Sequence, residues 1–264
     1  MGLEIVERIV HLVSELSKEN VDEVKPKLVS AVEELKRLFA EAKEELEKSG
    51  VAFGCDEEIR KIVEEVCRME VRVFGILGGE PFVRKKILLE VMEKVKDGGI
   101  EGSLVTNGTL INKEDIEKIV KIGWDLIRFS IDGLEKTHDW LRRKKCFSQI
   151  IRCIKRFNQV KKRMNSNHPT LEVNFVLNRK NYKELPKLIR FLSKLGISFV
   201  YVLPLIELTE EAKKLNIPEN NLKSVNKWLE KSEEVAKKFG IGTNCKEVIE
   251  RNMHVLANKA EEVL

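Results

Sequence analysis

The chain has 264 residues, of which 42% are hydrophobic and 34% charged, and its formal net charge is +5. This length suits one sizeable domain with an appendage, and the apolar content is enough to build a buried core. The charged segment Met1–Gly50 excludes a signal or transit peptide, and no apolar run approaches the length of a membrane span.

The first 50 residues predict a helical hairpin. Apolar residues recur at helical spacing in Leu3–Leu16, and Asn20 ends this first helix. Pro26 suits the first turn of a second helix, which runs to about Lys48. Such a hairpin cannot bury both apolar faces by itself, so it packs on the rest of the chain or forms an interface with a second copy. We expect the hairpin to mediate a homodimer.

Residues 51–204 predict alternating strands and helices. The predicted strands are Val51–Phe53, Glu70–Leu77, a strand containing Leu104–Thr106, Asp125–Ile131, Leu171–Leu177 and Ser198–Leu203. The predicted helices between them are Glu57–Arg68, Phe82–Lys96, Lys113–Ile122, Cys146–Lys162 and Tyr182–Leu195. This alternation indicates an α/β fold with a parallel sheet and right-handed crossovers, that is, a partial (β/α)6 barrel. Residues 205–264 predict a C-terminal helical cap with helices at Thr209–Leu215, Asn221–Phe239 and Cys245–Ala260.

The run Gly78-Gly79-Glu80-Pro81 directly follows a strand that contains Val71, Val73 and Ile76. The two glycines allow a close approach of the backbone to a ligand, and the proline suits the first turn of the next helix. Glu80 then lies at the carboxyl end of the strand, where open α/β sheets and barrels bind their ligands. Taken alone, the run also fits a plain strand-to-helix turn with a solvated glutamate.

This run and three later ones resemble, in order and spacing, the motifs of the radical SAM superfamily. The later runs are Thr106-Asn107-Gly108-Thr109, then Phe129–Gly133 followed by Thr137-His138-Asp139 and Arg142, then Val173–Pro186. The resemblance covers about half of the chain. It implies a pocket for S-adenosylmethionine formed by Gly78, Gly79, Glu80, Asn107, Ser130 and Arg142. In the family the position of Glu80 contacts the amino group, and the last three positions lie near the ribose and carboxylate.

The chain departs from this family in its cysteines. The family binds a 4Fe–4S cluster with a CxxxCxxC motif, and such clusters need several converging thiolates. Here the cysteines are Cys55, Cys67, Cys146, Cys153 and Cys245, and no two are closer than seven residues. We therefore expect no iron–sulfur cluster, no metal and no catalytic residue, and a vestigial pocket for S-adenosylmethionine at most. Free, scattered thiols also favour a reducing cytoplasm. The adjacent pair His138-Asp139 is interpreted as an ion pair or helix cap.

The strongest charge signal lies in Trp140–Leu171, which holds ten basic residues and no acidic one. These basic residues are Arg142, Arg143, Lys144, Lys145, Arg152, Lys155, Arg156, Lys161, Lys162 and Arg163. Such a block favours a polyanionic partner, and Trp140 is placed to stack on a base. All of the ten except Lys161 form the predicted nucleic-acid interface. The alternative is a solvated face of a thermophile's helix.

Together these patterns predict a non-catalytic, cytoplasmic binding or regulatory protein that engages RNA or a ribonucleoprotein such as the ribosome. One alternative is a radical SAM enzyme with a displaced or missing cluster motif. Another is a cluster-free enzyme that acts on a small ligand, such as S-adenosylmethionine, in the same pocket.

Overall fold

The computed structural model describes residues 56–69, 71–207 and 209–261, with side chains described as far as Met253. The chain divides into two compact units, Met1–Ile59 and Arg60–Leu264, and the sheet belongs to the second. The predicted hairpin of residues 1–50 and the predicted strand Val51–Phe53 lie outside the described residues. The homodimer expected from the hairpin therefore stays a prediction.

Among the described residues, six parallel strands form one sheet, in the same order along the sheet as along the chain. They are β1 (Val73–Ile76), β2 (Glu101–Thr106), β3 (Leu126–Ser130), β4 (Thr170–Leu177), β5 (Phe199–Pro204) and β6 (Gly242–Thr243). Helices connect successive strands, so the predicted α/β class with a parallel partial barrel is confirmed. Parallel strands also bring the carboxyl ends of all six to one edge of the sheet.

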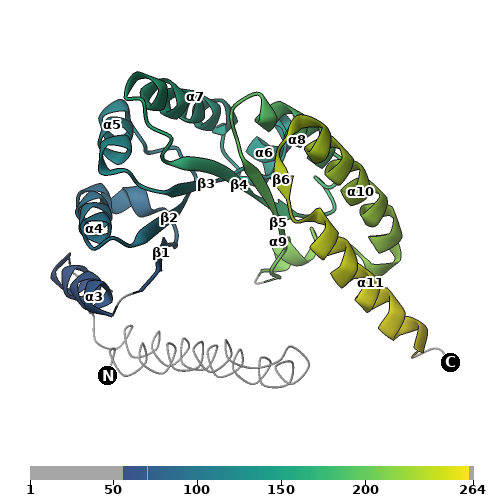
Figure 1. The fold of residues 1–264 in the computed structure, drawn as a ribbon. Coiled ribbons are helices and arrows are strands. Elements are labelled where there is room, and N and C mark those ends of the chain that lie inside the picture. Colours follow the sequence, from purple (N-terminus) through teal and green to yellow (C-terminus); the bar gives the residue numbers. More distant parts are fainter. Residues whose placement is uncertain (1–55, 70, 208, 262–264) are drawn as a thin grey trace. The chain divides into compact units, whose positions relative to one another are not determined.

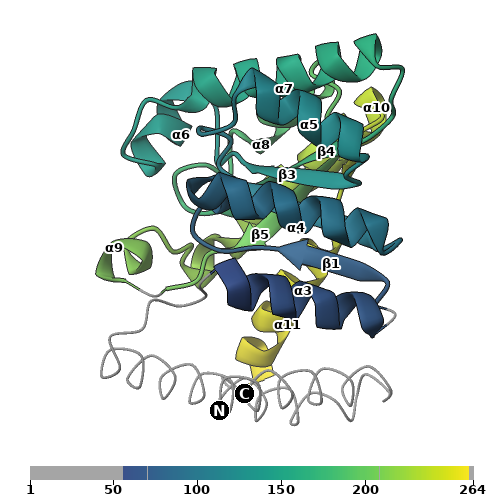
Figure 2. The ribbon, with the colours of Figure 1, turned by 90° about the vertical axis from the view of Figure 1, so that its left-hand side faces the viewer.

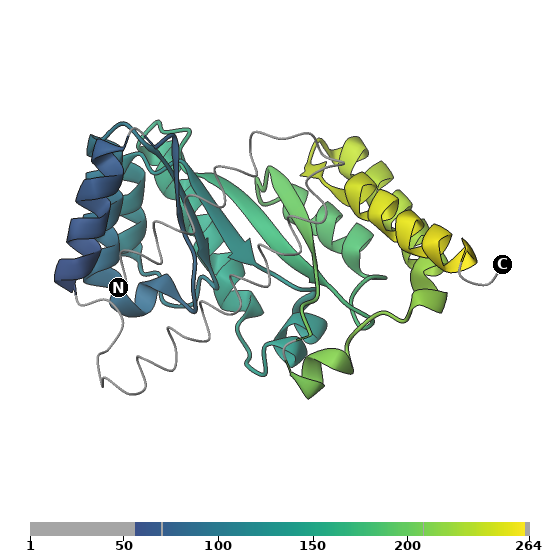
Figure 3. The same cartoon turned by 90° about the horizontal axis from the view of Figure 1, so that it is seen from below.

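The helices lie mainly on one side of this sheet. They are α3 (Asp56–Arg68), η1 (Pro81–Arg84), α4 (Lys85–Asp97), α5 (Lys113–Ile122), α6 (Glu135–Leu141), α7 (Phe147–Arg163), α8 (Leu185–Ser193), α9 (Glu210–Lys213), η2 (Glu219–Asn221), α10 (Leu222–Phe239) and α11 (Cys245–Glu261). Figure 1 shows α4, α5, α7, α8 and α10 on the outer side of the curved sheet, and the view from below in Figure 3 looks onto its inner side. No helix among the described residues is long and apolar enough to span a bilayer.

The core lies between the outer face of the sheet and these helices. In β4 the side chains alternate, so that Val173 and Phe175 are fully buried while Glu172 and Asn174 stay half-buried on the inner face. From α7, Phe157 meets Phe129 of β3 edge-to-face, with ring centroids 6.1 Å apart. The inner face, by contrast, carries polar side chains that the core does not use.

Local signals explain the boundaries of α5 and the start of η1. Asn112 begins α5 through a capping box with Asp115, and Gly123 ends it in the left-handed conformation, as such residues do. The predicted helix Phe82–Lys96 instead begins with the 3-10 turn η1, which has Pro81 in its first position. The short helix α6 lies in a segment for which no helix was predicted.

The far edge of the sheet is closed by an unexpected element. β6 is only two residues long and pairs with Phe199 and Val200 of β5. Directly after β6, the side-chain amide of Asn244 makes the hydrogen bonds to β5 that a backbone peptide group would make. The backbone N–H of Val202 donates to Asn244 Oδ1 at 2.8 Å, and Asn244 Nδ2 donates to the carbonyl oxygen of Val202 at 3.2 Å. The side-chain amide thus continues the ladder for one more residue.

The contact between Gly102 of β2 and the ring of Trp124 generates a test of the core packing. A Cβ atom at Gly102 would lie 2.3 Å from the indole of Trp124, which is fully buried. Because such overpacking costs about 1–3 kcal/mol, we expect Gly102→Ala to lower the free energy of unfolding by that amount in urea denaturation. Ser103→Ala, on the opposite face of the same strand, serves as the control. An unchanged free energy in Gly102→Ala would contradict the described packing.

Candidate functional site

The carboxyl edge of the sheet brings together the residues predicted to form a pocket. Gly78 and Glu80 follow β1, Asn107 follows β2, Ser130 ends β3, and Arg142 follows α6. Figure 2 shows α6 and α9, which follow β3 and β5, at this same edge. Ligands of open parallel sheets bind at this edge, so it is the candidate functional site. The role of each residue there stays a prediction.

Glu80 joins the ends of β1 and β2. Its Oε1 accepts hydrogen bonds from the backbone N–H of Phe82 at 3.2 Å and from Thr106 Oγ1 at 2.7 Å. Its Oε2 accepts a hydrogen bond from the backbone N–H of Asn107 at 2.7 Å. The carboxylate therefore fixes the turn into η1 and the loop after β2, and its interactions within the chain are those of a positioning residue.

The two glycines before Glu80 differ in what they require. Gly78 has a φ of +149°, a conformation that an L side chain rarely adopts. Gly79 has no such constraint, and a Cβ atom there would meet nothing within 4 Å. The packing of the described chain thus gives no reason for a glycine at position 79. The open space beside it fits the close approach of a ligand to the backbone.

Two further polar groups at this edge have free hydrogen-bonding capacity. Asn107 Oδ1 accepts from the backbone N–H and the hydroxyl of Thr109, at 2.9 and 2.7 Å. Within the described part of the chain, Asn107 Nδ2 and the hydroxyl of Ser130 have no partner. These groups are donors suited to the hydroxyl and carboxylate oxygens of a ligand.

Asp132 organises the end of β3 and was missed as a site residue. Its Oδ1 accepts from the backbone N–H of Val176 at 3.0 Å, and its Oδ2 lies 2.6 Å from Arg142 Nη2. Asn181 Nδ2 donates to the carbonyl oxygen of Asp132 at 2.9 Å. Arg142 is thereby held over the edge of the sheet by one of its nitrogens, and its remaining N–H groups point to no partner in the described residues.

The cluster His138, Asp139 and Cys146 resembles a metal site by distance, because its ligand atoms lie within 4.8 Å of one another. However, Asp139 Oδ1 already accepts the backbone N–H groups of Cys146 and Phe147, at 3.0 and 2.9 Å. His138 Nδ1 accepts the N–H of Asp132 at 3.1 Å, so the proton of the neutral ring is on Nε2, 3.4 Å from Cys146 Sγ. A metal on Nε2 would displace that proton to Nδ1, against the Asp132 N–H. The geometry is that of a helix cap, as predicted.

Burial sets the protonation of this cluster. Burial lowers the pKa of His138 below its ordinary value, although the carboxylates of Asp132 and Asp139 oppose this effect. Burial likewise raises the pKa of the Cys146 thiol, and the negative charge of Asp139 adds to that rise. The ring and the thiol are both neutral near pH 7, which suits the hydrogen bonds around them.

The described cysteines do not form a cluster site. Burial raises the pKa of Cys153 to about 12 and that of Cys245 to about 11, so both remain thiols. Cys67 lies at 3.7 Å from the carbonyl oxygen of Lys94, and Cys146 belongs to the cap of α7. Thiolates converging on one iron–sulfur cluster are therefore not found among the described residues, and Cys55 lies outside them.

The basic block is not one uniform cationic surface. Arg142 pairs with Asp132, Arg163 Nη2 lies 2.8 Å from Glu117 Oε1, and Lys161 Nζ donates to the carbonyl oxygen of Pro169 at 2.7 Å. The other cations of the block are exposed: Arg143, Lys144, Lys145, Arg152, Lys155, Arg156 and Lys162. Two carboxylates from outside the run, those of Asp132 and Glu117, thus neutralise part of a run that is purely basic along the chain.

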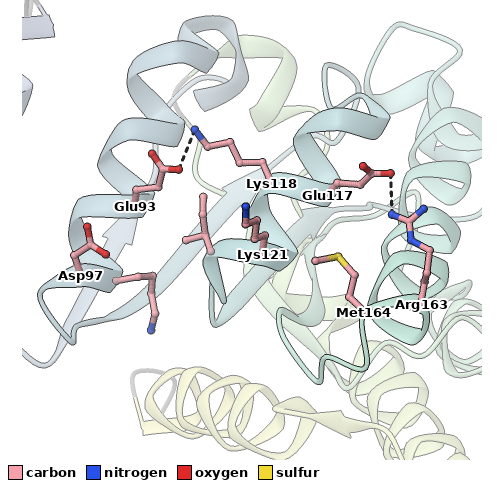
Figure 4. Close-up of a pocket in the computed structure, with 9 residues that line it drawn as sticks. Glu93, Asp97, Glu117, Lys118, Lys121, Arg163 and Met164 are labelled. Atoms are coloured by element: carbon pink, nitrogen blue, oxygen red, sulfur yellow. Dashed lines mark hydrogen bonds and ion pairs between the residues drawn. The ribbon is translucent and has the colours of Figure 1, made fainter.

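The outer helices enclose a groove of about 860 Å³ beside this block, lined by α4, α5 and the end of α7. Figure 4 shows that its charges pair across the helices, with Glu93 bound to Lys118 and Glu117 bound to Arg163. Its walls therefore mix both signs and offer little to a polyanion. The groove lies on the helical side of the sheet and shares no residue with the candidate site.

Comparison with known proteins places these features in a family. Residues 56–192 match the family model of the radical SAM superfamily. A tungsten-containing aldehyde ferredoxin oxidoreductase cofactor-modifying protein of Pyrococcus furiosus is 29% identical over 149 residues, 56% of this chain and 41% of that protein. A probable GTP 3',8-cyclase of Methanocaldococcus jannaschii is 32% identical over 158 residues, 60% of this chain and 50% of that protein. The chain spans about half the length of these relatives.

The fold has a solved counterpart. The structure of Streptococcus suis SuiB bound to S-adenosylmethionine superposes with a TM-score of 0.59 at 20% identity, covering 73% of this chain and 44% of SuiB. At this identity the likeness concerns the fold alone. It places the described sheet and helices among radical SAM folds.

These findings correct three predictions. The prediction of a non-catalytic module that engages RNA or the ribosome is wrong, because the relatives are named as enzymes or cofactor-modifying proteins and none as an RNA-binding protein. The interpretation as a pseudoenzyme fails for the same reason. The prediction of no iron–sulfur cluster and at most a vestigial pocket for S-adenosylmethionine is contradicted as well, because the matching superfamily uses S-adenosylmethionine with an iron–sulfur cluster and SuiB is bound to S-adenosylmethionine.

The hydrogen bonds of Glu80 generate a prediction on stability. Glu80→Ala removes an acceptor from Phe82, Thr106 and Asn107, and bonds to a charged acceptor contribute about 1.5–3 kcal/mol each, less where water replaces them. We expect a loss of about 2–4 kcal/mol in urea denaturation. Glu64→Ala, on the exposed face of α3, is the matched control. Equal stability of the two variants would show that Glu80 does not hold the edge together.

His138 generates a prediction on pH. Because its pKa in the folded state is lowered, the unfolded chain binds the proton first as the pH falls. The contribution of His138 to stability is complete above the unfolded pKa of about 6.5 and is lost progressively below it. We expect the free energy of unfolding to fall between pH 7.5 and 5.5, and to fall less in His138→Gln. The exposed His168→Gln serves as control, and an equal fall in all three proteins would refute the assignment.

Proposed function

Because this chain belongs to the radical SAM superfamily, we propose that it is an enzyme domain that binds S-adenosylmethionine at the carboxyl edge of its sheet. The observation that carries the proposal is the open space beside Gly79. The packing of the described chain does not require a glycine at this position. When bound, this cofactor supplies a sulfonium centre whose carbon–sulfur bonds are open to cleavage. The chain's own contribution is to bind and orient it.

The residues at the edge fit the polar groups of this cofactor. Backbone groups at Gly78 and Gly79 can approach its amino acid part closely. The free N–H groups of Arg142 and the hydroxyl of Ser130 suit its carboxylate, and the free amide of Asn107 suits a ribose hydroxyl. Glu80 supports this set by holding the loops that carry Gly79 and Asn107.

The proposal concerns binding of the cofactor and of a small organic substrate beside it. Two observations favour a small substrate: the name of one relative, a probable GTP 3',8-cyclase, and the half-buried polar inner face of the sheet next to the edge. Radical cleavage of S-adenosylmethionine needs an electron donor, which the described cysteines do not hold in place. The radical step is therefore no part of what these residues explain.

Gly79→Ala tests the proposal. The added methyl group meets nothing in the ligand-free chain, so the urea midpoint should stay unchanged. Since the methyl group would occupy the space of the ligand, we expect the affinity for S-adenosylmethionine to fall at least about tenfold in isothermal titration, or about 1.4 kcal/mol. Gly98→Ala, at the opposite edge of the sheet, should bind like the wild type.

Two outcomes would overturn the proposal. No binding of S-adenosylmethionine by the wild-type protein would remove the proposed function altogether. Equal affinity of Gly79→Ala and wild type would show that the cofactor does not lie against this backbone.

A further inference from the structure

The inner face of the sheet carries a charged pair that neither the core nor the carboxyl edge uses. Arg128 of β3 stands opposite Glu172 of β4 in the strand register, and both side chains point away from the outer helices. Arg128 Nε donates to Glu172 Oε2 at 2.8 Å. The two side chains are only 27% and 13% exposed, so neither charge is fully solvated.

An aromatic ring fixes the guanidinium from a second direction. The Cζ atom of Arg128 lies 4.6 Å from the ring centroid of Tyr201 on β5, across the intervening strand β4. Tyr201 is itself packed against Phe199, with ring centroids 4.2 Å apart. A guanidinium that is bonded at Nε and stacked on a ring has little rotational freedom left.

This arrangement leaves the outer edge of the guanidinium free. Among the described residues, no acceptor bonds to Nη1 or Nη2 of Arg128. A planar pair of N–H groups in fixed orientation matches the two oxygens of a carboxylate or phosphate. Partly buried arginines normally use these donors, so their freedom here points to an acceptor supplied by a ligand.

The position of this pair relates it to the candidate site. Ser130 and Asn174 lie on the same inner face, two residues further along β3 and β4 toward the carboxyl edge. Two residues of a strand span about 7 Å, the length of a small organic group. A ligand that extends from the edge onto the inner face would therefore pass Ser130 and Asn174 and reach Arg128.

We propose that Arg128, held by Glu172 and Tyr201, is a specificity-determining residue that binds an oxyanion group of the substrate, a carboxylate or a phosphate. The proposal rests on the proposed function, because it places the substrate beside S-adenosylmethionine. Glu172 and Tyr201 are positioning residues that orient the guanidinium. Glu172 also offsets its charge, so the site selects a planar or tetrahedral oxyanion by geometry more than by charge alone.

Site-resolved labelling of arginines tests the proposal without knowledge of the substrate. The full-length protein is treated with phenylglyoxal, which modifies guanidinium groups, and the rate at each arginine is measured by mass spectrometry. The reaction is repeated with glutarate as the carboxylate probe, with pyrophosphate as the phosphate probe, and with neutral glutaramide. Arg152 and Arg156, exposed on α7, report general anion binding to surface cations.

We expect Arg128 to react in the free protein. One of the two anions should slow its modification at least fivefold relative to Arg152 and Arg156, while glutaramide should leave the rate unchanged. The anion that protects identifies the group as carboxylate or phosphate. The proposal is overturned if Arg128 is inert without any anion, because its outer edge is then not free. It is also overturned if no anion protects Arg128 more than the two control arginines.

Variants separate recognition from structural support. Glu172→Gln keeps the shape of the side chain but removes the charge that orients Arg128, so it should weaken the protection while leaving S-adenosylmethionine affinity unchanged. Full protection in this variant would exclude Glu172 as a positioning residue. The affinity of the wild-type protein for S-adenosylmethionine is measured separately by titration. Loss of cofactor binding with intact protection removes the proposed function, and the reverse result removes only the oxyanion site.

Discussion

The carboxylate of Glu80 is the contact on which the candidate site depends. It accepts hydrogen bonds from two backbone N–H groups and one hydroxyl, which belong to two segments of the chain: Phe82 at the start of η1, and Thr106 with Asn107 at the end of β2. Backbone amides at the end of a sheet must find acceptors, and here one side chain supplies them. The same contact fixes Gly79 and Asn107 in relation to each other, so the space beside Gly79 is defined before any ligand arrives.

The regular part of the fold follows from the sequence because its causes are local. The capping box of Asn112 and Asp115, the alternation along β4 and the apolar stripe of α7 each depend on residues a few positions apart. β6 could not be foreseen in this way, because two residues carry no periodicity and their strand exists only through pairing with β5. The 3-10 start at Pro81 likewise depends on the acceptor that Glu80 provides.

The functional interpretation failed where its causes were tertiary. The segment Trp140–Leu171 contains no acidic residue, yet Asp132 and Glu117 from outside it form ion pairs with two of its arginines. The cysteines lack the CxxxCxxC spacing, but the step from that spacing to a protein without a cofactor is wrong, because family membership rests on the whole pattern of strands and loops. Arg128 was missed for the same reason. Its partners Glu172 and Tyr201 lie on two other strands, and only the parallel register brings the three together.

The side-chain amide of Asn244 limits the pairing of β5 with strands of other molecules. An open strand offers a row of unpaired N–H and C=O groups, which is a template for pairing with another molecule. On β5, β6 pairs with Phe199 and Val200, and the side chain of Asn244 then bonds to the N–H and the carbonyl oxygen of Val202. A side-chain amide ends after one residue and cannot recruit a further strand. At this position the partial barrel stays open without presenting β5 as a seed for aggregation.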